Sequence, residues 1–161
     1  MKQGFSPVYD ARTEVLILGT APSVKSLEKQ QYYANPGNQF WNILFHSLAV
    51  EDPLEYSQRL ELLKDHRIGL WDVYATFERK GSLDVNFSSI VPNDFTTLLT
   101  KAPIKTILTN GQLAYKEALK NPTIPNLAIQ QLPSTSGANN GQSKTRMVAW
   151  KEALATSIKA K

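Results

Sequence analysis

Cysteine is absent from this sequence of 161 residues, and histidine is scarce. Without cysteine the chain has no disulfide, no thiolate metal ligand and no cysteine nucleophile. The two histidines, His46 and His66, are too few for a histidine-rich zinc site, and we expect both to be structural or surface residues. We therefore predict a protein that uses no metal and no cofactor.

Long apolar runs are also missing. No stretch approaches the roughly 18 consecutive apolar residues of a membrane-spanning helix, and the opening segment MKQGFSPVYDAR lacks the apolar centre of a signal peptide. Hydrophobic residues make up 42% of the chain and charged residues 20%, a balance typical of globular proteins. The length fits one domain of roughly 100–200 residues. We expect a single cytoplasmic domain over residues 1–161, with no membrane contact.

Acidic residues become rare after residue 100. Residues 1–100 contain nine Lys/Arg and twelve Asp/Glu, whereas residues 101–161 contain nine Lys/Arg and two acids, Glu117 and Glu152. The net charge of +4 thus divides into −3 and +7. By itself such an asymmetry more often marks a plain solvated surface, but it admits a polyanionic partner such as nucleic acid.

Short apolar runs alternate with helical patterns along the chain. The run EVLILG is typical of a buried parallel strand. The predicted strands are 14–19, 68–74, 105–109 and 127–132, and the predicted helices are one that opens at Pro36 with Asn35 as its cap, 53–65, 94–101 with Asn93 as its cap, 112–120 and 144–159. We expect a loop at residues 20–23, a polar stretch from there to Tyr33, and a polar, irregular run over 77–92. This alternation predicts a three-layer α/β/α fold around a four-stranded, mainly parallel sheet.

The loops that follow the predicted strands are the candidate ligand site, because ligands of open parallel sheets bind beyond the carboxyl ends of the strands. These loops are Gly19–Ser23, Asp72–Thr76, Asn110-Gly111 and Pro133–Asn140, all rich in small, hydroxyl and amide residues. The first loop, GTAPS, lacks the Lys-Ser/Thr pair of a P-loop, so it weakly supports nucleotide binding and equally fits a turn without a ligand. Asp72 is the one acid at a strand end, and we expect it to anchor a neighbouring loop in preference to a catalytic role.

The segment YYANPGNQFW places aromatic and amide side chains around the start of a predicted helix. Phe40 and Trp41 have the helical spacing of core residues. For Tyr32 and Tyr33 two interpretations are open, a place in the core or stacking on a planar ligand. Asn38 is expected one turn inside the helix, where it lowers helix propensity without a structural gain.

The segment LPSTSGANN follows the last predicted strand. Ser134, Thr135 and Ser136 suit hydrogen bonds to phosphate oxygens, and Lys144 and Arg146 supply a basic flank just downstream. A flexible turn without a ligand is the alternative.

Taken in order, GTAPS, YYANPGNQFW, WDV and LPSTSGAN resemble motifs of the uracil-DNA glycosylase superfamily, closest to its mismatch-specific and hypoxanthine-acting branches. The runs RKGSLD at 79–84 and PNDF at 92–95 resemble the hypoxanthine (deoxyinosine) branch in particular. The resemblance covers essentially the whole chain, and its two main elements are more specific together than singly. It implies a monofunctional DNA glycosylase that flips a deaminated base (hypoxanthine, uracil or xanthine) out of DNA and hydrolyses its N-glycosidic bond.

The resemblance also implies roles for individual residues. The superfamily usually has Asn or Asp in the first loop to position water; this sequence has Ala21 there, and Asn38, with Asn35 second, is expected to serve instead. The second motif, usually His or Asn before Pro-Ser, begins here with Leu132, so one group that polarises the leaving base is missing. The residues expected around the base are Gly19, Thr20, Ala21, Tyr33 and Asn110, and those expected on DNA are Ser23, Ser134, Thr135, Ser136, Lys144 and Arg146.

We expect a monomer whose partner is double-stranded DNA carrying a damaged base, with single-stranded DNA left open. The preferred base, and whether uracil is excised without a polar residue at position 21, are open at this point. The alternatives are a mismatch-specific uracil/thymine glycosylase, a non-catalytic nucleic-acid-binding module on the same scaffold, and a small-molecule hydrolase. Salt-dependent DNA binding without an abasic product would mark the binding module.

Overall fold

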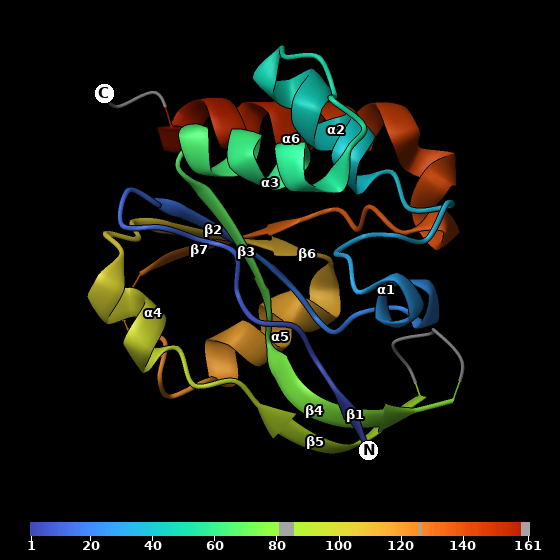
Figure 1. The fold of residues 1–161 in the computed structure, drawn as a ribbon, viewed down its shortest axis with the longest axis vertical. Coiled ribbons are helices and arrows are strands. Elements are labelled where there is room, and N and C mark those ends of the chain that lie inside the picture. Colours follow the sequence, from blue (N-terminus) through green and yellow to red (C-terminus); the bar gives the residue numbers. More distant parts are fainter. Residues whose placement is uncertain (81–85, 126, 159–161) are drawn as a thin grey trace.

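A four-stranded parallel sheet forms the centre of the molecule (Figure 1). The structure, a computed structural model, describes residues 1–80, 86–125 and 127–158. The strands lie in the order β3 (Ile68–Asp72), β2 (Val15–Gly19), β6 (Thr106–Asn110) and β7 (Ala128–Leu132), and each pair is parallel. All four predicted strands are therefore present.

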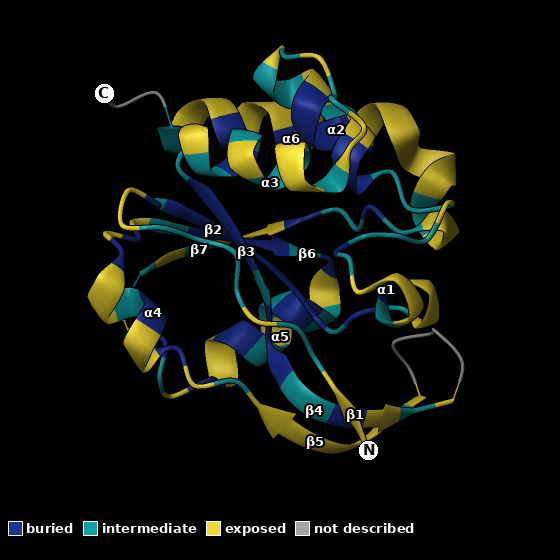
Figure 2. Cartoon of the chain, in the orientation of Figure 1, coloured by how far each residue is buried: buried dark blue, intermediate teal, exposed yellow. Residues whose placement is uncertain are grey.

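Both faces of this sheet are covered, and strand β2 shows why its sequence is continuously apolar. Val15 and Ile17 pack into the core on one face, whereas Leu16 and Leu18 pack into the core on the other. All four side chains are fully buried. Successive side chains of a strand point to opposite faces, so a strand enclosed on both sides carries no polar alternation. Figure 2 shows β2 buried throughout.

Helices form the two outer layers. Helices α2 (Phe40–Leu48), α3 (Tyr56–Asp65) and α6 (Ser143–Ile158) cover one face, and α4 (Thr96–Lys101) and α5 (Gln112–Lys120) cover the other (Figure 1). Phe40 and Trp150 meet edge to face with ring centroids 6.0 Å apart, which packs α2 against α6. The predicted three-layer α/β/α fold is confirmed. Within the described part of the chain, no helix has the length and apolar character needed to cross a membrane.

A second, antiparallel sheet was not predicted. Strands β1 (Lys2–Gln3), β4 (Tyr74–Arg79) and β5 (Phe87–Pro92) pair in the order β1-β4-β5, so the expectation of irregular structure over 77–92 was wrong. The β4–β5 register shifts twice, and such irregularities break the alternation by which a strand is found in a sequence. Residues 81–84 of the RKGSLD run lie outside the described residues.

Several helix starts also differ from expectation. Helix α2 begins at Phe40, so Asn35 does not cap it and Asn38 lies before it. Helix α1 (Val24–Lys29) was not predicted; Ser23 caps it by accepting a hydrogen bond from the Ser26 N–H at 3.1 Å. A helix of six residues shows too little periodicity to be read from its sequence.

The predicted cap of the 94–101 helix was also wrong. Helix α4 begins at Thr96, whose N–H donates to Asp94. The Asn93 side chain instead donates to the Asp72 carbonyl at 2.8 Å, which holds the chain where it leaves β3. Helix α3 begins at Tyr56, later than expected, with the Glu55 carboxylate accepting from the Gln58 N–H at 2.9 Å.

Candidate functional site

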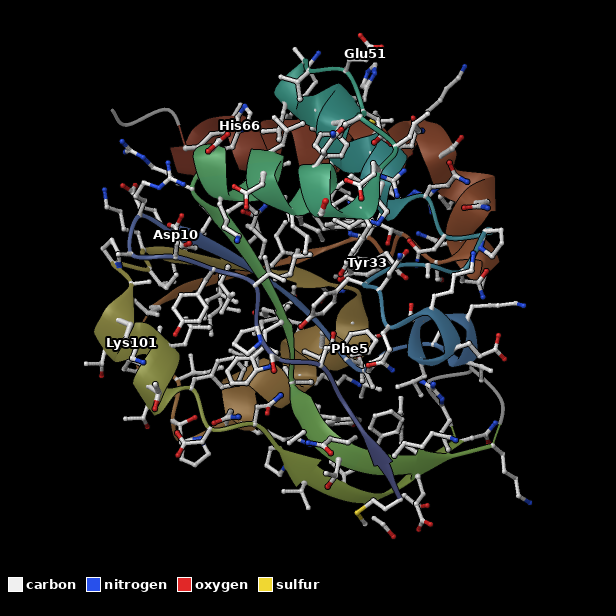
Figure 3. All side chains as sticks on the ribbon, in the orientation of Figure 1. Phe5, Asp10, Tyr33, Glu51, His66 and Lys101 are labelled. Carbon is white, nitrogen blue, oxygen red and sulfur yellow. The ribbon has the colours of Figure 1, made fainter. Side chains whose placement is uncertain are left out.

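A polar cavity opens at the carboxyl ends of β2, β3 and β6, as expected for a parallel sheet. Figure 3 shows Tyr33 and Phe5 on this side of the molecule, between the sheet and α1, whereas His66 lies before β3 at the other end. Ten predicted site residues line the cavity: Gly19, Thr20, Ala21, Ser23, Tyr33, Asn35, Asn38, Asn110, Ser134 and Ser136. Thr135, Lys144 and Arg146 do not line it.

Three polar side chains from distant segments form a connected network beside the cavity. The Thr135 hydroxyl donates to Asn38 Oδ1 at 2.8 Å and accepts from Asn110 Nδ2 at 2.9 Å. Asn110 Oδ1 in turn accepts from the Thr135 N–H at 2.9 Å. Because Thr135 is fully buried, its hydroxyl serves this internal network and is not presented to solvent as a phosphate contact.

Asn38 is oriented by two hydrogen bonds to the same atom. Its Oδ1 accepts from the Phe40 N–H at 2.9 Å as well as from the Thr135 hydroxyl. A backbone N–H is always a donor, so it fixes which end of the amide is oxygen. Both lone pairs of Oδ1 are then engaged, and Nδ2 is the end of Asn38 with hydrogen-bonding capacity to spare. Asn38 was expected inside the helix, where it would lower helix propensity, but it lies before the first residue of α2 and does not.

Asn35 shapes the turn that carries Asn38. Its Oδ1 accepts from the Gly37 N–H at 2.9 Å, and its carbonyl accepts from the Asn38 N–H at 2.9 Å. Asn35 therefore belongs to an Asx turn, a local structure in which a side chain replaces a backbone acceptor.

Tyr33 separates the cavity from the aromatic core. Its ring stacks on Phe40 with centroids 3.9 Å apart and planes inclined by 21°, so one face is already covered. Its φ of 57° lies in the left-handed region, which is rare for an aromatic residue and concentrates at functional sites. Burial, and secondly the negative charge of Asp72, raise the pKa of the Tyr33 hydroxyl, with a hydrogen bond from Asn110 opposing them. The phenol is therefore protonated at neutral pH.

The neighbouring Tyr32 packs in the core and also borders the cavity. It is 4% exposed, and its hydroxyl donates to the Ser6 carbonyl at 2.8 Å. Phe40 and Trp41 are buried as predicted. Leu132, which stands at the polar position of the second motif, is also a core residue and does not line the cavity.

The Ser134–Ser136 loop rests on a buried arginine. Arg146 is 2% exposed, and its Nη1 donates to the carbonyls of Ser134 at 3.2 Å and Ser136 at 3.4 Å. Burial lowers the pKa of this guanidinium, and its Nε has no hydrogen-bond partner among the described residues. Arg146 thus supports the loop from beneath, whereas Lys144 is exposed on the first turn of α6.

Two charged residues that were not predicted as binding residues also line the cavity. Asp72, expected to anchor a loop, is 4% exposed at the end of β3. Arg79 donates to the Pro22 carbonyl and lies over the Phe77 and Phe87 rings, 5.2 and 5.0 Å from their centroids. Strand β4 was not predicted from the sequence, so Arg79 could not be placed beside the cavity.

Neither histidine lines the cavity, and the described residues contain no cluster of three or more His, Asp or Glu that could hold a metal ion.

An α/β/α sheet whose strand ends carry a cavity of amides and hydroxyls has its ligand site where parallel sheets place one, and amide and hydroxyl groups suit hydrogen bonds to the edge of a base. The family model of the uracil DNA glycosylase superfamily matches residues 6–156, and the chain belongs to that superfamily.

Two named relatives are similar to this chain over nearly its whole length. The chain is 41% identical over 154 residues to a hypoxanthine DNA glycosylase of Methanosarcina acetivorans, covering 93% of this chain and 96% of the relative. It is 41% identical over 158 residues to a hypoxanthine DNA glycosylase of Methanosarcina barkeri, covering 95% and 98%. The solution NMR structure of a proposed uracil DNA glycosylase from Methanosarcina acetivorans matches with a TM-score of 0.84 at 40% identity, covering 96% and 97% of the two chains.

Proposed function

We propose that this chain is a DNA glycosylase that removes hypoxanthine from deoxyinosine in double-stranded DNA and leaves an abasic site. The observation that carries the proposal is the network of Asn38, Thr135 and Asn110, which brings amides from two distant segments to one cavity. Relatives of 41% identity over nearly the whole chain are named for the same activity.

The target base must leave the duplex before the cavity can hold it, because its glycosidic bond is inaccessible within the stack. Unstacking costs a few kcal/mol and is cheapest for a mispaired base, which itself favours deaminated bases. Tyr33 is held in place by its stacking on Phe40, so its other face is a preformed platform for the flipped base. A rigid platform loses little entropy when the base binds.

The N-glycosidic bond breaks with its electron pair leaving on the base, and water adds to the resulting cation-like sugar. The proton that the added water gives up neutralises the departing base. We assign the positioning of this water to Asn38, through a hydrogen bond donated by Nδ2 to the water oxygen. The second lone pair of that oxygen is left for attack on the sugar. Holding the water in position accounts for a large part of the rate enhancement of such a hydrolysis, because it removes the entropic cost of bringing water and sugar together.

DNA is held, in this proposal, by the rim of the cavity. Ser134 and Ser136 offer hydroxyls and backbone groups to the phosphates, and Lys144 adds an exposed positive charge on α6. The Ser23 hydroxyl caps α1, which fixes the loop between β2 and α1 against the same rim.

The reaction is proposed to be monofunctional. Among the described residues, those that line the cavity include no lysine, and a lyase step needs an amine to form a Schiff base. Borohydride should therefore trap no covalent protein–DNA adduct, and a trapped adduct would show that the enzyme is bifunctional.

The proposed function is tested with end-labelled duplexes that contain one deoxyinosine, deoxyuridine or deoxyxanthosine. After incubation, alkali cleaves the strand at abasic sites, and we expect the fastest cleavage at deoxyinosine. Asn38→Ala should lower the rate by a factor of about 100 or more, whereas Asn42→Ala, which changes an exposed asparagine of α2, should not. Faster release of mismatched uracil would favour a mismatch-specific glycosylase, and DNA binding without cleavage would favour a binding module.

A further inference from the structure

Asp72 is the one carboxylate among the described residues that line the cavity. It is the last residue of β3 and pairs in register with Gly19, the last residue of β2. Its side chain is 4% exposed. A carboxylate so far removed from water interacts strongly with a neighbouring donor, because little solvent screens it.

The carboxylate lies directly over the backbone of Gly19. A Cβ at Gly19 would stand 2.6 Å from Asp72 Oδ1 and 3.1 Å from the Tyr33 hydroxyl oxygen. The missing side chain therefore lets the carboxylate and the phenol share one surface of the cavity. A planar base that stacks on Tyr33 would present its edge to this surface.

Asn110, the residue expected to read the base edge, has most of its hydrogen-bonding capacity committed elsewhere. Its Oδ1 and Nδ2 are both bonded to Thr135, and it also hydrogen-bonds the Tyr33 hydroxyl. A carboxylate has about four lone-pair positions on its two oxygens, so Asp72 can accept a further hydrogen bond beside those it already makes.

Deamination of adenine changes the edge of the base in a way that a carboxylate detects. N1 of adenine is an acceptor, whereas N1 of hypoxanthine carries a hydrogen and is a donor. An ionised carboxylate only accepts, so it attracts the N1–H of hypoxanthine and repels the N1 lone pair of adenine.

We infer that Asp72 is a specificity-determining residue, whose carboxylate accepts the N1–H of a flipped 6-oxopurine and disfavours adenine. The inference rests on the proposed function, since it assigns substrate selection to the same cavity. Because an anion beside the base opposes the build-up of negative charge on it, Asp72 contributes selectivity at some cost in rate.

Asp72→Asn tests this assignment, because the amide keeps the shape of the carboxylate but can donate as well as accept. Affinity is measured for deoxyinosine and deoxyadenosine, each made resistant to cleavage by 2′-fluorine and placed opposite a spacer without a base. No base pair is then broken on flipping. We expect the preference of the unmodified protein for hypoxanthine to fall about 10-fold or more in Asp72→Asn.

Asp65→Asn is the matched control, since this carboxylate is 59% exposed at the end of α3. It should leave the preference unchanged, and thermal unfolding verifies that both variants fold. An unchanged preference in a folded Asp72→Asn protein overturns the assignment, even if deoxyinosine is excised. Absence of excision by the unmodified protein overturns the proposed function instead, because the binding comparison needs no cleavage.

Discussion

The Thr135 hydroxyl donates to the Asn38 amide oxygen at 2.8 Å, which joins two loops that lie 97 residues apart in the sequence. Backbone contacts reinforce this junction, since the Gln39 N–H donates to the Thr135 carbonyl at 2.9 Å. Gly37 and Gly137 approach so closely that a Cβ on Gly137 would stand 3.2 Å from the Gly37 carbonyl oxygen. The loop before α2 and the loop after β7 therefore form one unit, with Thr135 at its centre.

Replacing Thr135 with valine keeps the shape of the side chain but removes its hydroxyl. Asn38 Oδ1 and Asn110 Nδ2 each lose a buried partner, so we expect the free energy of unfolding to fall by about 1–3 kcal/mol. Excision should slow by roughly 10-fold or more, because a water misplaced by an ångström reacts far more slowly. Single-turnover kinetics and urea unfolding measure the two effects. Thr135→Ser should retain both properties; an equal loss in this variant would show that the hydroxyl is not the important group.

Asn38→Asp distinguishes the two ends of the Asn38 amide. The carboxylate keeps an oxygen for the Phe40 N–H and the Thr135 hydroxyl, but it cannot donate as Nδ2 does. If Asn38 positions water through Nδ2, excision at neutral pH should fall about as far as in Asn38→Ala, by a factor of about 100. The fold should persist, as measured by thermal unfolding. Near-normal excision by Asn38→Asp would instead assign the role to an oxygen acceptor.

The central sheet could be predicted because its physical signal is local. A strand such as β2 is buried on both faces, so its sequence is an uninterrupted apolar run. The position of the cavity followed from the parallel order of the strands, and the end of β6 and the loops after β2 and β7 supply part of its polar lining. These features depend on a few consecutive residues and on one general rule of topology.

The connections within the site could not be predicted in the same way. The pairing of Thr135 with Asn38 and Asn110 depends on how loops meet in space, and no spacing in the sequence encodes it. Arg146 looked like a surface cation beside a hydroxyl-rich loop, but its side chain is buried with its donors on the Ser134 and Ser136 carbonyls. Asp72 was expected to anchor a loop, but its place against Gly19 could not be read from the sequence, because that glycine belongs to another strand.

Gly19→Ala tests the close contact between β2 and its neighbours. The added methyl group would stand 2.6 Å from Asp72 Oδ1, closer than van der Waals contact allows. We expect a loss of about 1–3 kcal/mol in the free energy of unfolding, together with weaker binding of deoxyinosine DNA. Gly141→Ala is the control, because a Cβ there meets nothing within 4 Å. Equal stability of the two variants in urea would mean that the Asp72 side chain moves aside freely.

Lys144 and Arg146 are two residues apart in the first turns of α6 but should affect DNA binding in different ways. Lys144 is exposed, so if it contacts a phosphate, Lys144→Gln should reduce the slope of log affinity against log salt concentration by about 1 without changing stability.

Arg146→Met should leave that slope nearly unchanged but remove the donors that hold the Ser134 and Ser136 carbonyls. Its free energy of unfolding should fall by about 1–3 kcal/mol, because buried carbonyls lose their partners. Fluorescence titrations over a range of salt concentrations, combined with urea unfolding, separate the two effects. A reduced slope for Arg146→Met with unchanged stability would place its guanidinium on the DNA rather than beneath the loop.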